Sequence, residues 1–142
     1  MKTIKQILAI KGNQVFTTDP SVLVVDAVKD MAKKKVGALI VLTNDEIKGV
    51  ITEQDFTRRV ILQDLDSETT TVGEVMTHPV DGIRPEQTVN EGMSIMTEKR
   101  IRHLPVIEDD KLLGLISIGD LVKEVISDQE TIIEQLEQYI HN

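Results

Sequence analysis

The sequence predicts an α+β fold made of two copies of a β-α-β-β-α unit with pseudo-twofold symmetry, followed by a C-terminal helix. Residues 18–55 align without a gap on residues 83–120, at a constant offset of 65, so the chain contains an internal repeat. Within each copy, apolar residues recur at three- and four-residue spacing in some segments and form short unbroken runs in others. These two patterns are typical of helices and of buried strands, respectively.

The repeat divides the chain into residues 1–66, residues 67–126 and a C-terminal amphipathic helix over residues 127–142. Each copy begins with a short extended segment, "QVFTT" or "VDGIR", that leads into Asp19-Pro20 or Arg84-Pro85. Because proline fixes φ near the helical value, it suits the first turn of a helix, and we expect a helix to begin at each proline. The apolar faces of these helices consist of Val24, Ala27, Val28 and Met31 in the first copy and of Val89, Met93 and Met96 in the second.

A hairpin follows the helix in each copy. "GALIVL" and "HLPVI" predict strands, "TNDEIKG" and "EDDKLLG" carry turn residues, and "VIT" and "LIS" return as the partner strands. A second helix then begins at Thr52 or Ser117. Its apolar side carries Phe56, Val60 and Ile61 in the first copy and Leu121, Val125 and Ile126 in the second.

The stretch "GLISIGDLV" places Asp120 three residues after Ser117, and Thr52 with Asp55 repeats this spacing in the first copy. A hydroxyl residue followed three residues later by an acid forms a helix capping box, which is sufficient to explain a single occurrence. Two occurrences at the same place in a repeat favour a binding role. The N-terminus of a helix attracts phosphate through its free N–H groups and partial positive charge, and an acid one turn further on accepts hydrogen bonds from ribose hydroxyls.

With these motifs the chain resembles the tandem CBS domain pair, or Bateman module, over residues 4–126. The resemblance is carried by "GVITEQD" and "GLISIGD", by "VGEVMTHPV" and by "KRIRHLPVIEDDKLLG". It implies a regulatory module that binds an adenine nucleotide in a cleft between the two copies. AMP or NAD is the expected ligand, and ATP or S-adenosylmethionine is the alternative.

The resemblance also implies roles for particular residues. Ser117 and Thr52 would contact phosphate, and Asp120 and Asp55 would hold the ribose diol. The adenine would lie against the strand segments around Thr18, Ile83, Gly37 and His103.

The two copies differ in charge beside these motifs. Arg102 and His103 precede the second strand of the second copy, where the first copy has Gly37 and Ala38. We therefore include Arg102 and His103 among the ligand-binding residues and predict that the second site is the stronger. The lysines of "KKKVGA" are explained equally well by a binding role and by the preference of cations for the C-terminus of a helix.

Composition excludes several classes of function. A net charge of −8 and a pI near 4.8 argue against a nucleic-acid or membrane-surface protein, because polyanions are repelled by the average field. The chain has no cysteine, the N-terminus lacks the features of a signal peptide, and no apolar run could span a membrane, so we expect a soluble, cytoplasmic protein. The three histidines have no metal-ligand spacing, and neither a P-loop nor a G-x-G-x-x-G motif is present, so we predict neither a metal site nor an enzyme.

The C-terminal segment "SDQETIIEQLEQYIHN" lies outside the repeat. It begins with a possible capping box at Ser127 and Glu130, and its apolar face consists of Ile132, Ile133, Leu136 and Ile140. This face packs either on its own chain or on a second subunit, and we expect a homodimer. Two classes of function remain: an adenylate sensor that signals to an unidentified regulated protein, and a structural or interaction protein of the same fold without adenylate binding.

Overall fold

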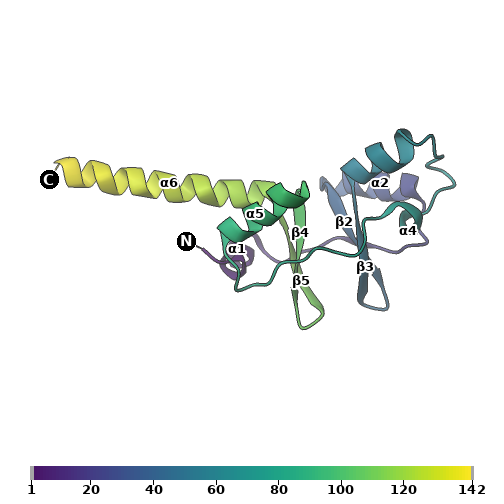
Figure 1. Cartoon of the computed structure of the whole chain (residues 1–142), viewed down its shortest axis with the longest axis horizontal. Helices are drawn as coiled ribbons and strands as arrows, with labels where there is room; N and C mark the ends of the chain where they lie inside the picture. Colours follow the sequence, from purple (N-terminus) through teal and green to yellow (C-terminus); the bar gives the residue numbers. More distant parts are fainter. Residues whose placement is uncertain (1, 142) are drawn as a thin grey trace. The chain divides into compact units, whose positions relative to one another are not determined.

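The computed structural model describes residues 2–141. Figure 1 shows its helices and strands along the chain. Their bounds are α1 (Ile4–Lys11), β1 (Thr17–Thr18), α2 (Val24–Lys34), β2 (Ala38–Thr43), β3 (Glu46–Thr52), α3 (Glu53–Asp55), the π-helix η1 (Phe56–Ile61), α4 (Val72–Val75), α5 (Val89–Lys99), β4 (His103–Glu108), β5 (Lys111–Ser117) and α6 (Ile118–His141). The predicted α+β class and the predicted helix–hairpin–helix order in each repeat are confirmed.

The chain forms two compact units that do not coincide with the two sequence repeats. Within the described residues, unit 1 comprises 2–13, 82–109 and 113–141, and unit 2 comprises 14–81 and 110–112. The short helix that precedes the β-α-β-β-α unit of each repeat is therefore exchanged: α1 packs in the unit of the second repeat, and α4 packs in the unit of the first. Each unit has a hydrophobic core of its own.

Unit 2 contains the three-stranded sheet, in the order β1-β2-β3. β1 runs parallel to β2, with Thr18 beside Val41, and β2 runs antiparallel to β3, with Ala38 beside Thr52. The core beneath this sheet consists of Val24, Ala27, Met31, Leu39, Val41, Ile51, Val60, Val72 and Val75. It is entirely aliphatic apart from methionine, as the low aromatic content of the sequence requires.

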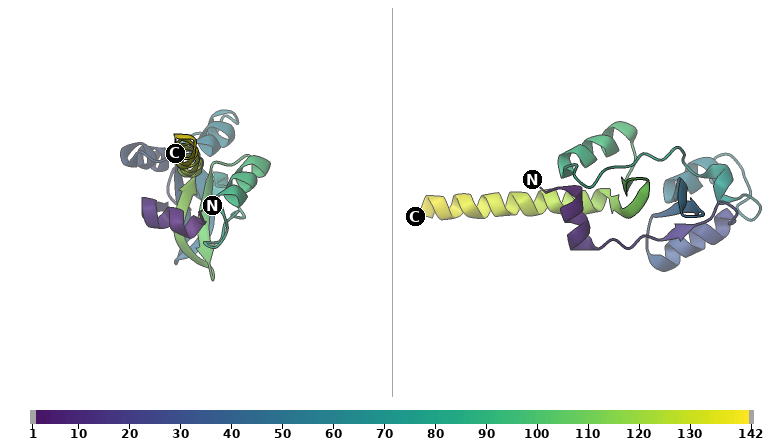
Figure 2. Two further views of the ribbon diagram at one scale, coloured as in Figure 1. Left: turned by 90° about the vertical axis from the view of Figure 1, so that its left-hand side faces the viewer. Right: turned by 90° about the horizontal axis from the view of Figure 1, so that it is seen from below.

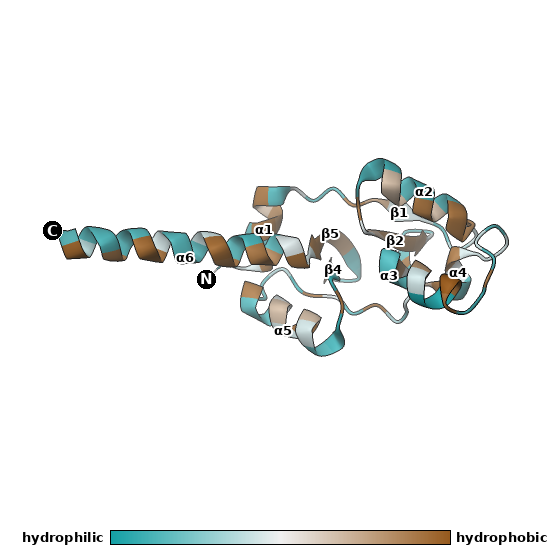
Figure 3. Cartoon of the chain, turned by 90° about the horizontal axis from the view of Figure 1, so that it is seen from above, coloured by the Kyte–Doolittle hydropathy of each residue, from teal (hydrophilic) through white to brown (hydrophobic). Residues whose placement is uncertain are grey.

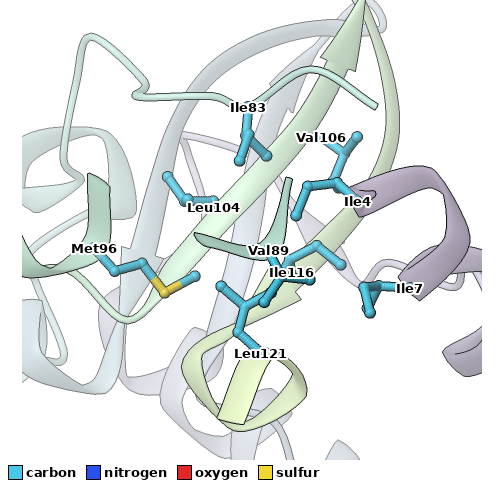
Figure 4. Packing of buried hydrophobic residues seen from close by; sticks show 9 residues of the cluster. All are labelled: Ile4, Ile7, Ile83, Val89, Met96, Leu104, Val106, Ile116 and Leu121. Atoms are coloured by element: carbon cyan, nitrogen blue, oxygen red, sulfur yellow. The ribbon is translucent and has the colours of Figure 1, made fainter. Parts of the chain in front are cut away.

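Unit 1 pairs β4 with β5 and covers them with α1, α5 and α6. Ile83 adds a single parallel bridge beside Val106, the same register that Thr18 and Val41 have in unit 2. The N-terminal segment is held by backbone hydrogen bonds from Ile4 N–H to the Gln87 carbonyl (2.8 Å) and from Val89 N–H to the Lys2 carbonyl (3.1 Å). Figure 4 shows the core that results, with Ile4, Ile7, Ile83, Val89, Met96, Leu104, Val106, Ile116 and Leu121 packed together.

A glycine in each hairpin allows these exchanged segments to approach the sheet closely. A Cβ atom on Gly114 would lie 2.7 Å from a methyl carbon of Leu8 on α1, and one on Gly49 would lie 2.7 Å from the sulfur of Met76 after α4. Gly49 and Gly114 are equivalent positions of the repeat. At Gly49 a Cβ would also lie 2.8 Å from the Thr77 carbonyl oxygen, so tertiary packing against the backbone requires the glycine there, whereas at Gly114 the obstacle is the flexible end of Leu8.

The first helices begin later than the prolines predict. Pro20 and Pro85 lie in turns, whereas α2 begins at Val24 and α5 begins at Val89. The residues just before these helices, Leu23 and Thr88, are extended and form β-bridges to other segments. The expectation of a helix beginning at each proline was wrong because a turn occupies residues 20–22 and 85–87 and the bridges then hold Leu23 and Thr88 extended.

The predicted helix start at Ser127 was also wrong. α6 is continuous from Ile118 to His141, and the Ser127 carbonyl accepts a hydrogen bond from Thr131 Oγ1 at 3.1 Å within the helix. No glycine or proline follows Gly119 that could interrupt the helix. The C-terminal helix is thus an extension of the last helix of the second repeat (Figure 2). Among the described residues, no helix combines the length and the apolar character needed to cross a bilayer.

Candidate functional site

Ser117 and Asp120 form a capping box where β5 turns into α6. Ser117 N–H donates to Asp120 Oδ2 at 2.8 Å, and Asp120 N–H donates to Ser117 Oγ at 3.2 Å. The serine hydroxyl also donates to the same carboxylate oxygen, at 2.9 Å. The local capping interpretation of this spacing is therefore correct, and any binding role is added to it.

Lys11, at the end of α1, completes the surroundings of Asp120. Its Nζ donates to Asp120 Oδ2 at 2.7 Å and to the Leu115 carbonyl at 2.8 Å. Sequence reasoning missed Lys11 because it lies outside the aligned repeat and 109 residues away from Asp120. Burial raises the pKa of Asp120, but the hydrogen bonds from Lys11 and Ser117 and the charge of Lys11 outweigh it, so the pKa lies below its ordinary value of 3.8.

The other carboxylate oxygen of Asp120 is not used by the protein. All the hydrogen bonds and the ion pair of this side chain end on Oδ2, and Oδ1 accepts none from residues 2–141. The side chain is 19% exposed. Asp120 is thus fixed in position and ionised, and it retains one oxygen that can accept hydrogen bonds from a ligand.

Asp55, the equivalent acid in unit 2, has both oxygens engaged. Thr52 donates to Oδ2 through its N–H (3.0 Å) and its hydroxyl (3.1 Å), which reproduces the capping box. Thr77 Oγ1 donates to Oδ1 at 2.9 Å, and Arg59 Nε lies 3.8 Å from the same atom. The side chain of Asp55 is 11% exposed, less than that of Asp120. Thr77 is a second contact residue that sequence reasoning missed.

The structure places the predicted residues at positions 37 and 102 beside these helix starts. The Gly37 carbonyl accepts a hydrogen bond from Glu53 N–H at 3.1 Å, and the Arg102 carbonyl accepts one from Ile118 N–H at 2.8 Å. The capping hydroxyls of Thr52 and Ser117 bind the N–H three residues further on, the third of each helix. Of the first three N–H groups of each helix, only the second, on Gln54 or Gly119, has no acceptor among the described residues. The helix starts are therefore mostly satisfied by the protein itself.

Ala38 and His103 begin the strands β2 and β4 next to these carbonyls. Ala38 is buried and faces Thr52 across the sheet, and His103 is half-buried. The side chain of Arg102 is exposed beside the start of α6. Each acid therefore has one cation beside it, Lys11 at Asp120 and Arg59 at Asp55, and the units differ in that unit 2 also has Thr77 at its acid and has Gly37 where unit 1 has Arg102.

Thr18 and Ile83 lie further away along the strands. Their partners Val41 and Val106 are three residues from Ala38 and His103, about 10 Å along a strand. Ile83 is a core residue with 1% exposure, and its N–H donates to the Pro105 carbonyl at 2.9 Å. Neither the side chain nor the N–H of Ile83 is open to a ligand in this structure.

The lysines of "KKKVGA" lie at the C-terminal end of α2, and this location explains their contacts. Lys34 Nζ donates to Asp30 at 2.9 Å, one turn earlier, and lies 4.8 Å from the centre of the Phe16 ring. Lys33 is in the last turn of the helix, and Lys35 caps it in a left-handed conformation. These positions are typical of cations that complement the helix dipole.

No group of three or more His, Cys, Asp or Glu side chains in the described part of the chain could hold a metal ion.

The fold and the paired capping boxes define a tandem CBS module. The CBS domain model matches residues 5–62 and 72–127, and the chain belongs to this family. CBS domain pairs are generally regulatory rather than catalytic.

Individual relatives agree with this assignment. A CBS-domain structure from Burkholderia ambifaria MC40-6, named as a signal-transduction protein, is 49% identical, has a TM-score of 0.87, and covers 90% of this chain and 96% of that one. The CBS domain-containing protein CBSX3, mitochondrial, of Arabidopsis thaliana is 38% identical over 97% of this chain and 71% of its own length. The CBS domain pair of protein MJ0100, solved in complex with 5'-methylthioadenosine and S-adenosyl-L-methionine, is 21% identical with a TM-score of 0.77 over 87% of this chain and 99% of that one.

Proposed function

We propose that this protein is a regulatory module that binds an adenine nucleotide at Ser117 and Asp120 of unit 1 and signals its occupancy to a partner protein. The observation that carries the proposal is the free Oδ1 of Asp120, on a carboxylate that Ser117 and Lys11 hold in place. A fixed carboxylate with one open oxygen is suited to accept hydrogen bonds from the two adjacent hydroxyls of a ribose.

The charges around Asp120 favour an anionic nucleotide. Lys11 Nζ lies 2.7 Å from the carboxylate, and the Gly119 N–H at the helix start has no acceptor among the described residues. Arg102, whose carbonyl accepts from Ile118 N–H at the helix start, has an exposed side chain. These three groups could bind a phosphate that approaches the helix. AMP, NAD and ATP fit such surroundings better than S-adenosylmethionine, whose sulfonium is positively charged.

The complex of MJ0100 shows that a CBS pair can hold adenosine compounds. At 21% identity this likeness concerns the fold, and it assigns no residue of this chain to a ligand.

The proposed site in unit 2 is weaker. Asp55 already gives both carboxylate oxygens to Thr52 and Thr77, so a ribose would have to displace a protein hydrogen bond. The first repeat also has Gly37 and Ala38 where the second has Arg102 and His103. The site with Thr52 and Asp55 is therefore the secondary one, with Thr18 at its edge.

Lys11 also provides a route for signalling. It is the last residue of α1, and two residues later the chain passes from unit 1 into unit 2. A phosphate that drew Lys11 away from Asp120 would alter the conformation of this connection. Occupancy of the site would in this way change the surface presented to a regulated protein.

Thermal melting and calorimetry with AMP, NAD, ATP and S-adenosylmethionine test the proposal. A ligand that binds only the folded protein raises the melting temperature with concentration, and we expect this for at least one of the three anionic nucleotides. The matched variants are Asp120→Asn and, as a control, Asp109→Asn in the exposed β4–β5 turn, where Asn is compatible with the positive φ. Binding that is equal in the wild type and in Asp120→Asn would show that the site is elsewhere.

A second candidate function is that of an interaction protein without adenylate binding. It is favoured by the capping boxes themselves, since Ser117 with Asp120 and Thr52 with Asp55 are already satisfied structurally. The absence of a melting shift or calorimetric signal with any of the four ligands would support this candidate.

A further inference from the structure

The distal half of α6 has no partner within the described chain. The last buried side chain of the helix is Glu124, and every residue from Gln129 to His141 is exposed. Figures 1 and 2 show this part of α6 extending beyond α1 and α5 of the same unit. A helical segment of this length is only marginally stable in water on its own, so its stability requires packing that this chain does not supply.

The exposed apolar residues of α6 follow a heptad pattern. Figure 3 shows hydrophobic bands recurring along the helix. Successive members of the series are alternately four and three residues apart: Val122, Ile126, Gln129, Ile133, Leu136 and Ile140. This spacing of 3.5 residues is that of the a and d positions of a left-handed coiled coil, and we refer to these six residues as the α6 seam.

We propose that the α6 seam packs against the same seam of a second copy of this chain, as a parallel two-stranded coiled coil. The a positions are Ile126, Ile133 and Ile140, which are all β-branched, and Leu136 is at a d position. This distribution favours two parallel strands over three or four. A seam of this kind is self-complementary, so an identical helix related by a twofold axis is the partner that fits it.

The residues beside the seam favour the parallel orientation. On one side, at the e positions, lie Lys123, Glu130 and Glu137; on the other, at the g positions, lie Val125, Ile132 and Tyr139. In an antiparallel pair with the two seams overlapped, the e positions of the helices face each other, so Lys123 faces Glu137 but Glu130 meets Glu130 of the second copy with no cation between them. In a parallel pair each g position faces the e position five residues later in the second copy, so Glu130 lies beside Val125 and Glu137 beside Ile132, and the apolar stems of the glutamates contact these side chains.

Gln129 is the one polar residue of the α6 seam. In a parallel dimer in register, it meets Gln129 of the second copy, and the two amides can hydrogen-bond. Gln129 is at a d position, and this polar layer disfavours any register that would set the amide against an apolar side chain, at some cost in stability. The proposal thus explains why a glutamine interrupts an otherwise apolar series.

Engineered cysteines provide a direct test because the chain has none of its own. Leu136→Cys places a thiol in the seam, where the two copies approach closely enough for a disulfide, and Gln138→Cys places one at the f position on the opposite face. Under mild oxidation, we expect most of the Leu136→Cys protein to become a covalent dimer and the Gln138→Cys protein to remain uncrosslinked. Sedimentation of both reduced variants and of the wild type should give twice the chain mass.

A monomeric wild type, a mass of three or more chains, or a dimer in which Leu136→Cys crosslinks no faster than Gln138→Cys would each overturn the proposal. A second pair of variants excludes misfolding as the cause. Leu136→Glu with Ile140→Glu should raise the dimer dissociation constant by about a hundredfold or more, because charges would be buried in the seam. Thr131→Glu adds one charge at an f position and should leave the dimer dissociation constant unchanged. At protein concentrations low enough for all chains to be monomeric, unit 1 should melt at the same temperature in the wild type, in Leu136→Glu with Ile140→Glu and in Thr131→Glu.

Discussion

Asp55 and Asp120 occupy the same position of the repeat, form the same capping box and differ in what surrounds their second oxygen. In unit 2, Thr77 and Arg59 close Oδ1 of Asp55. In unit 1, Lys11 binds the oxygen that Ser117 already uses and leaves Oδ1 of Asp120 open. The comparison shows that a repeated motif can serve structure in one copy and remain available to a ligand in the other, depending on residues outside the motif.

The largest expected effect is on ligand affinity when each acid is changed to the amide. Asp120→Asn should weaken AMP or NAD binding about tenfold to a hundredfold, because a charged acceptor for the ribose hydroxyls is lost, at about 1.5 to 3 kcal/mol. Asp55→Asn should change affinity much less, since its carboxylate is used within the protein. Calorimetry on the two variants measures this difference. Equal losses in both would mean that the two sites are alike despite their different hydrogen bonds.

The next largest effect is on the stability of unit 2. Thr77→Val removes the donor to Asp55 Oδ1 and leaves a nearly buried carboxylate oxygen without a hydrogen bond, so the free energy of unfolding should fall by about 1 to 3 kcal/mol. Thr57→Val is the control, because its hydroxyl only donates to the Glu53 carbonyl at an exposed site. Urea unfolding compares the two. If Thr77→Val were as stable as Thr57→Val, the hydrogen bond from Thr77 to Asp55 would not contribute to the stability of unit 2.

A smaller effect is expected from Lys11. Lys11→Met removes a positive charge 2.7 Å from Asp120 and should weaken AMP binding about twofold to fivefold, while binding of uncharged adenosine changes less. Lys5→Met, also on α1 and exposed, removes the same charge away from the site and serves as the control. A loss of equal size for AMP and adenosine would indicate that Lys11 acts by positioning Asp120 and not by attracting phosphate.

The smallest effect is on the pH dependence of stability. The pKa of Asp120 is lowered in the folded protein, so its ionised form stabilises the fold above the ordinary value of 3.8, and this contribution is lost as pH falls through the folded pKa. The difference in unfolding free energy between wild type and Asp120→Asn should therefore be constant near neutral pH and shrink below about pH 4. Denaturant unfolding at several pH values measures it. A difference that grows on acidification would contradict the assigned direction of the shift.

The sequence by itself determined the features that depend on residues close together in the chain. The spacing of Thr52 with Asp55 and of Ser117 with Asp120 predicts capping boxes, and both form, since each needs only one turn of backbone. The apolar runs and turn residues likewise predict both hairpins, where Asn44 with Asp45 and Asp109 with Asp110 adopt the positive φ expected of such turns. The repeat made these local signals stronger, because each was seen twice.

Tertiary structure alone decided which acid remains open and where several helices begin. Bridges at Leu23 and Thr88 delay α2 and α5, and the exchange of α1 and α4 between the units brings Lys11 to Asp120 and Thr77 near Asp55. These partners approach through packing of segments up to 109 residues apart, which no local pattern encodes. The free oxygen of Asp120 follows from that packing, because a capping box fixes one oxygen of the carboxylate and leaves the other to whatever the fold places beside it.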